Sequence, residues 1–167
     1  MPSHCPACRQ PYLQRVNREG WGERALSAVF VYPYRCQVCT HRFFALDWGH
    51  RYTKEHVDVR QYERLPVQCP AWYTVAQTGG PDRQGEATVT DLSIGGCGME
   101  VRFPFEPGML CSLEIQTWED QLPVRVESAI VRVVRPKVVG VEFLELRPAE
   151  KQRLSQFMQG LLLINRR

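Results

Sequence analysis

The chain has 167 residues, of which 44% are hydrophobic and 23% charged, and its formal net charge is +3. This composition is typical of an ordinary globular protein, and it excludes a membrane span because the longest apolar runs are far below the roughly 20 residues needed to cross a bilayer. The polar start, Met1 to Gln10, does not resemble a secretory signal peptide. Seven cysteines, four of them in C-x-x-C pairs, indicate metal binding in a reducing cytoplasm rather than a secreted disulfide framework.

The N-terminal segment contains two C-x-x-C pairs with 27 residues between them, formed by Cys5, Cys8, Cys36 and Cys39. Each pair can form a tight turn that directs two thiolates at one ion, and four thiolates complete the tetrahedral sphere that Zn²⁺ prefers. The chain between the pairs has Gly20 and Gly22 near its middle and suits a β-hairpin. The segment resembles a zinc ribbon, and we predict a structural zinc module over residues 1–46.

Several features of this module leave alternatives open. His4 and His41 lie beside the cysteines and could replace one of them as a ligand, and a redox C-x-x-C is the alternative to a metal site. Arg9 and Thr40 follow the pairs where glycine is common, which predicts slightly strained turns. Residues 1–52 carry seven arginines against three carboxylates, interleaved with aromatic residues. That mixture suits nucleic acid, a protein partner or simply the core of the module.

A second domain follows a stretch rich in charge and histidine. We predict a linker at residues 47–57 and a domain over residues 58–167, because β-branched residues, alternation and turn residues there indicate six strands. The predicted strands are residues 64–75, 85–92, 98–103, 110–118, 124–135 and 138–145. Strands at a spacing of roughly 8–12 residues favour a small, closed or nearly closed antiparallel barrel. An apolar stripe over residues 148–164 then predicts an amphipathic helix that begins at Pro148.

Two short motifs lie at the start of this domain. Arg60 and Arg64 form an R-x-x-x-R pair, and Asp91, Ser93 and Gly96 form D-x-S-x-x-G further along the chain. Arginine pairs at this spacing arise by chance in so arginine-rich a chain. A D-x-S-x-x-G motif that follows such a pair in the correct order and at the correct distance is not expected by chance. Together they resemble the signature of the PilZ family of bacterial receptors, which bind the second messenger cyclic di-GMP.

The resemblance covers about residues 58–148 and implies a six-stranded barrel with a C-terminal helix, in agreement with the strand pattern. It also implies cyclic di-GMP as a ligand at the five motif residues. Arginine forks match guanine O6 and N7 and stack on bases, and the Asp91 carboxylate can accept guanine N–H groups. Ser93 offers a hydroxyl, and Gly96 allows a close backbone approach. Without the resemblance, the arginines suit a solvated linker and Asp91 to Gly96 a simple turn.

The remaining residues favour a receptor over an enzyme. We find no nucleophile beside a base, no paired carboxylates and no phosphate-binding helix turn, so we expect no catalysis. Cys69, Cys97 and Cys111 are predicted to be small buried residues. Val59 stands where some relatives carry a further arginine, which favours one bound ligand molecule over two.

We therefore expect a cytoplasmic receptor in which cyclic di-GMP binding reorients the zinc ribbon toward a protein partner. The alternative is an adaptor that binds nucleic acid or protein through the basic ribbon, with a barrel that does not bind ligand. Steep salt dependence would mark the nucleic-acid case.

Overall fold

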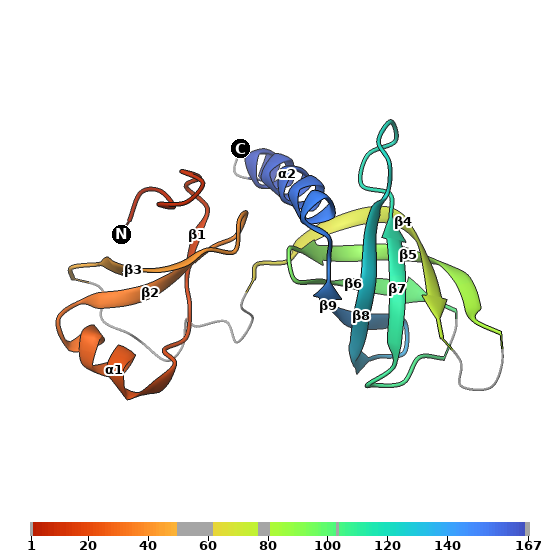
Figure 1. The fold of residues 1–167 in the computed structure, drawn as a ribbon, viewed down its shortest axis with the longest axis horizontal. Helices are drawn as coiled ribbons and strands as arrows, with labels where there is room; N and C mark the ends of the chain where they lie inside the picture. Colours follow the sequence, from red (N-terminus) through yellow and green to blue (C-terminus); the bar gives the residue numbers. More distant parts are fainter. Residues whose placement is uncertain (1, 50–61, 77–80, 103, 166–167) are drawn as a thin grey trace. The chain divides into compact units, whose positions relative to one another are not determined.

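The computed structural model describes residues 2–49, 62–76, 81–102 and 104–165 (Figure 1). The chain divides into two compact units, Met1–Glu63 and Arg64–Arg167. Most of the linker predicted at residues 47–57 lies outside the described residues, so the domain limits predicted from the sequence remain a prediction. No helix in the described ranges is both long and apolar enough to cross a membrane.

The first unit is built on a three-stranded antiparallel sheet of order β1-β2-β3 (Figure 1). Its elements in chain order are β1 (Leu13–Arg15), α1 (Gly20–Ala28), β2 (Val31–Cys36) and β3 (Arg42–Leu46). The β2–β3 hairpin closes around the second C-x-x-C pair, since Arg35 pairs with Arg42 across it. One face of the sheet forms a small core, in which Tyr32, Tyr34 and Cys36 are buried.

Helix α1 is a departure from the sequence prediction, which expected a hairpin where this helix lies. Two glycines in nine residues disfavour a helix, but Glu23 lies in its first turn, where negative charge is favourable. The Glu23 carboxylate also accepts a hydrogen bond from the Glu19 N–H at 2.6 Å. The helix has no buried residue, and Trp21 is 86% exposed. The two glycines therefore favoured the hairpin prediction over a helix.

The second unit is the predicted barrel, and the prediction is confirmed. Its strands are β4 (Leu65–Val75), β5 (Arg83–Ser93), β6 (Gly96–Val101), β7 (Leu110–Ile115), β8 (Val124–Val134) and β9 (Val138–Glu145). They form a closed antiparallel barrel of order β4-β5-β6-β9-β8-β7, which the pairing of β4 with β7 closes (Figure 1). The C-terminal helix α2 (Pro148–Asn165) starts at the predicted proline.

Alternation along the strands fills the barrel with aliphatic side chains. Leu113, Ile115 and Val126 are at most 1% exposed, and burial of each such side chain contributes roughly 1.5–3 kcal/mol. Helix α2 packs against β4 and β8 through its apolar stripe; the buried members are Leu154, Phe157, Met158 and Leu162. The three single cysteines are also buried, as predicted; they are Cys69, Cys97 and Cys111.

Candidate functional site

Asp91, near the end of β5, and Arg64, just before β4, form an ion pair on the outside of the barrel. Leu65 pairs with Leu92 inside the barrel, so that Asp91, which pairs with Pro66, faces outward. Arg64 Nη1 lies 2.9 Å from Asp91 Oδ1, and the Gly98 N–H donates to the same oxygen at 3.1 Å. The two side chains are 29% and 33% exposed. The structure thus brings one residue of each predicted motif together at a partly open position.

Ser93 and Gly96 close the turn between β5 and β6 beside this pair. The Ser93 hydroxyl is buried and donates to the Gly96 carbonyl oxygen at 2.9 Å. A Cβ on Gly96 would lie 2.3 Å from the Val141 carbonyl oxygen, so only glycine fits there. Both residues therefore hold the end of β5 that carries Asp91, and direct contact of either with a ligand stays a prediction. Arg60 lies outside the described residues.

The residues just before Arg64 contact the second C-x-x-C turn within the first unit. The Glu63 N–H donates to Gln37 Oε1 at 2.7 Å, and Arg35 Nη1 donates to the Tyr62 hydroxyl at 2.9 Å. The Arg35 guanidinium carbon also lies 5.3 Å from the centre of the Tyr62 ring. Gln37 is 4% exposed. These contacts of Gln37 and Arg35 could not be predicted from the sequence, because no local pattern links the two residues to a segment so distant along the chain.

The four predicted zinc ligands form one cluster. Their sulfur atoms lie within 4.8 Å of one another, with Cys5 Sγ 3.6 Å from Cys39 Sγ and Cys8 Sγ 3.5 Å from Cys36 Sγ. Four sulfurs at a Zn–S distance of about 2.3 Å stand about 3.8 Å apart in a tetrahedron, so the donor set fits that ion. All four are free thiols. Burial raises the pKa of the Cys36 and Cys39 thiols, and a bound cation would offset that penalty on the thiolates.

The backbone around the cysteines has the same form at both pairs. The N–H of Arg9 donates to the Cys5 carbonyl at 2.8 Å, and the N–H of Thr40 donates to the Cys36 carbonyl at 3.2 Å. Arg9 and Thr40 have φ angles of 58° and 66°, in the left-handed region that glycine adopts without strain. The chain thus keeps two matched turns although non-glycine residues occupy the left-handed positions. The ring of His41 stacks on that of Phe43 at 6.0 Å between centroids.

A buried polar network lies within the first unit. Asp47 is fully buried and accepts hydrogen bonds from Arg15 and from the Tyr34 hydroxyl, the latter at 2.6 Å. Although burial raises the pKa of Asp47, these donors hold it below the ordinary value. Burial and the hydrogen bond to Asp47 raise the pKa of Tyr34 to about 12. Arg15 also lies over the Tyr32 ring at 4.0 Å. This arginine and these tyrosines therefore form core structure rather than an open binding face.

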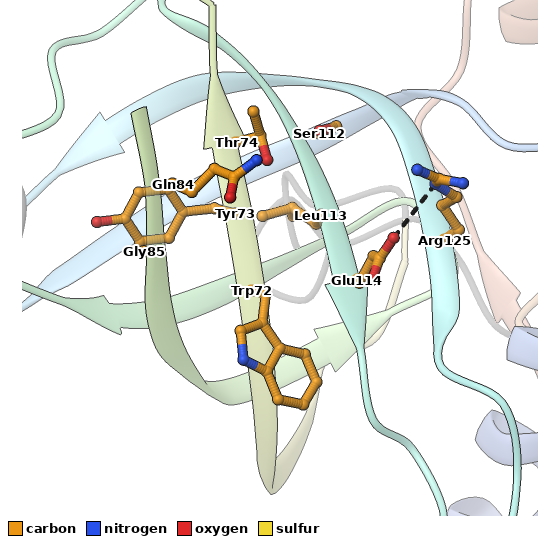
Figure 2. Close-up of a pocket in the computed structure, with 9 residues that line it drawn as sticks. All are labelled: Trp72, Tyr73, Thr74, Gln84, Gly85, Ser112, Leu113, Glu114 and Arg125. Atoms are coloured by element: carbon orange, nitrogen blue, oxygen red, sulfur yellow. Dashed lines mark ion pairs between the residues drawn. The ribbon is translucent and has the colours of Figure 1, made fainter. Parts of the chain in front are cut away.

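Hollows on the barrel wall lie apart from the Arg64–Asp91 pair. Figure 2 shows one of about 480 Å³, lined by Trp72, Tyr73, Thr74, Gln84, Gly85, Ser112, Leu113, Glu114 and Arg125. Its charged groups are Glu114 and Arg125, whose Oε1 and Nε lie 3.3 Å apart and exposed to solvent. No nucleophile stands beside a base among these nine residues, so the hollow offers no catalytic arrangement.

Residues 58–160 match the model of the PilZ domain family. No curated protein matches the chain. Among solved structures it is similar to the Bacillus subtilis inhibitor of motility MotI/DgrA, with a TM-score of 0.54 and 18% identity over 82% of this chain and 75% of that one. It is also similar to Escherichia coli YcgR in complex with c-di-GMP, with a TM-score of 0.51 and 15% identity over 92% of this chain and 75% of that one. At these identities the similarity shows the fold.

Proposed function

The chain belongs to the PilZ domain family, whose model matches more than half of it, and from this premise we propose that it is a non-enzymatic receptor for cyclic di-GMP. The observation that carries the proposal is the ion pair between Arg64 and Asp91, because it unites the two halves of the motif at an accessible position on the barrel wall. The solved complex of YcgR with c-di-GMP supports the choice of ligand.

The proposed site binds the ligand through complementary hydrogen-bonding groups. Asp91 supplies a carboxylate that accepts guanine N–H groups, and charge-assisted bonds of this kind are roughly twice as strong as neutral ones. Arg64 supplies a fork for guanine O6 and N7 or for a phosphate, and Arg60 supplies a second one. An ion pair as exposed as Arg64–Asp91 contributes at most about 1 kcal/mol. Ligand contacts can therefore replace or extend it at little expense.

We further propose that ligand binding is transmitted to the N-terminal unit, in which Cys5, Cys8, Cys36 and Cys39 hold a structural zinc ion. Tyr62 and Glu63 lie between the two arginines in the sequence, and both contact the second C-x-x-C turn, through Arg35 and Gln37. Movement of the arginines toward a ligand would therefore pull on a segment anchored beside the metal ligands. Reorientation of the ribbon toward a protein partner is the proposed output.

The receptor proposal is tested by calorimetric titration of cyclic di-GMP into zinc-loaded protein. Saturable binding is expected in the wild type and is expected to be lost in Arg64→Ala and in Asp91→Ala. Arg125→Ala removes an arginine from another ion pair of the barrel, with Glu114, and is expected to bind as the wild type does. Absence of wild-type binding at tens of micromolar ligand would refute the receptor.

Transmission to the ribbon is tested by solution scattering with and without cyclic di-GMP. A ligand-dependent change in the profile is expected for the wild type. Gln37→Ala removes the acceptor of the Glu63 N–H and should reduce that change while binding is retained. Identical profiles of the free and bound wild type would exclude reorientation.

A second function has one observation in its favour. Trp21 and Trp48 are 86% and 72% exposed on the arginine-rich first unit, and exposed aromatic rings among arginines can stack on unpaired bases. The rival proposal is an adaptor that binds single-stranded nucleic acid there and has a barrel without ligand. This proposal predicts nucleic-acid binding that weakens steeply as the salt concentration rises and that persists in Arg64→Ala.

A further inference from the structure

The glycines on the strands around the Arg64–Asp91 pair differ in whether the neighbouring atoms leave room for a side chain. A Cβ on Gly96 would lie 2.3 Å from the Val141 carbonyl oxygen, and a Cβ on Gly98 would lie 2.1 Å from Asp91 Oδ2. The clash at Gly96 is with backbone, so the fold demands glycine there, whereas a Cβ on Gly98 would displace the Asp91 carboxylate from its present position. A Cβ on Gly140 would meet nothing closer than Val133 Cβ at 3.6 Å, an ordinary van der Waals contact.

Backbone conformation does not explain Gly140 either. Its φ angle is outside the left-handed region, in contrast to Gly20, Gly49 and Gly108. Glycine within a strand is destabilising by roughly 0.5–1 kcal/mol relative to alanine. A strand glycine often marks a β-bulge or a place where another molecule approaches the backbone closely. The pairing of β8 with β9 shifts register between Val131 and Val133, but the extra residue of this bulge lies on β8, so the bulge does not require glycine on β9.

The position of Gly140 indicates what that molecule contacts. Its neighbours Val139 and Val141 point into the barrel, at 3% and 1% exposure, so Gly140 faces outward. It pairs with Gly98 on β6, which in turn pairs with Asp91 on β5. The Asp91 carboxylate lies over Gly98, and the next strand, roughly 4.8 Å away, presents bare backbone.

The far side of this bare backbone is apolar. Val133 of β8 pairs with Gly140 and is 47% exposed. The space above Gly140 therefore has a carboxylate on one side and an aliphatic side chain on the other. A flat aromatic ring with N–H donors on one edge fits such a space: the edge reaches the carboxylate and the face lies against the backbone. Guanine has this chemistry, with N1–H and N2–H on one edge.

We propose that Gly140 is a specificity-determining residue of the cyclic di-GMP site, an inference that rests on the proposed function. Its missing side chain leaves room for one guanine to lie flat on the wall of the barrel, with its N1–H and N2–H edge toward Asp91 and its other end against Val133. The site thus extends over four strands, from Asp91 on β5 across β6 and β9 to Val133 on β8. A side chain at position 140 would lift the base away from the carboxylate.

The test is titration of cyclic di-GMP into Gly140→Val and Gly140→Ala, with thermal unfolding of each variant. Valine is a good strand former, so Gly140→Val is expected to keep its unfolding midpoint and to lose affinity by about tenfold or more, the usual effect of a steric misfit in a binding pocket. Ser112→Val places the same side chain at an outward position of β7 and should bind as the wild type does.

The outcomes separate the two proposals. A folded Gly140→Val that binds with wild-type affinity overturns the role of Gly140 and leaves the receptor in place. Should valine unfold the barrel, Gly140→Ala decides: a loss of affinity at an unchanged or higher unfolding midpoint supports the inference, and wild-type affinity overturns it. Absence of binding by the wild type overturns both.

Discussion

The two units of this chain are stabilised by different kinds of interaction. The barrel is filled with aliphatic side chains such as Leu113 and Val126. The first unit comprises only Met1–Glu63, and its interior holds a carboxylate, an arginine and a cluster of thiols. Domains this small bury too little apolar surface to be more than marginally stable. We therefore expect the fold of the first unit to depend on the proposed zinc ion and on pH, and that of the barrel to depend on packing.

The largest effect is expected from breaking the cysteine cluster. Cys36→Ser removes one of four proposed zinc ligands, and metal binding contributes about 10–16 kcal/mol to the folding of zinc-finger peptides. We expect the first unit to unfold while the barrel stays intact, as seen in amide NMR spectra. Cys111→Ala, which removes a buried thiol of the barrel, should leave the first unit folded. A Cys36→Ser spectrum with both units folded would show that the cluster needs no metal.

A smaller effect, which destabilises the barrel and leaves the first unit unchanged, is expected from a substitution in the barrel core. Leu113→Ala leaves a cavity at a residue that is 1% exposed, and such changes destabilise by about 2–5 kcal/mol. Urea unfolding followed by amide signals should show the barrel midpoint lowered and that of the first unit unchanged. Leu110→Ala, on the same strand but 53% exposed, should change stability by only about 0.5 kcal/mol. Equal shifts in both units would mean that they unfold together.

The smallest effect concerns alkaline pH and the first unit alone. The pKa of Tyr34 is raised from 10.0 to about 12 by burial and by Asp47, so the folded state favours the neutral phenol. This contribution is fully present below pH 10 and is lost as the pH rises toward 12, by on the order of 1–2 kcal/mol. Tyr34→Phe should flatten the decline of first-unit stability over that range, and Tyr12→Phe should not. An identical decline in both variants would contradict the assignment.

The barrel could be predicted from sequence because its residues carry periodic signals. Alternation such as Val124–Arg125–Val126–Glu127 predicts directly which side chains face inward. The apolar stripe over residues 148–164 likewise predicts helix α2. Strand β6 starts earlier than predicted because Gly96 and Gly98, which resemble strand breakers, fill places where a Cβ would collide with neighbouring atoms.

Only the motif residues of the candidate site could be predicted from the sequence, and their contacts could not. The motif identifies Ser93, but the direction of its hydroxyl, into the turn toward Gly96, follows from the fold. The contact of Gln37 with the Glu63 N–H joins residues 26 positions apart. The role proposed for Gly140 depends on residues of the strands that pair with β9 and its neighbour. Such long-range relations have no local pattern. Helix α1 was missed because its two glycines favour a turn.

The closure of the barrel also determines where this chain is vulnerable to self-association. Each barrel strand has a neighbour on both sides, whereas β1 and β3 each have one outer side in the described three-stranded sheet. Such edges can template strand addition by another copy, although short strands such as β1 are poor templates. Aggregation through added strands would therefore begin at β3, next to the cysteine turn. We therefore expect the proposed zinc ion to protect the chain from precipitation.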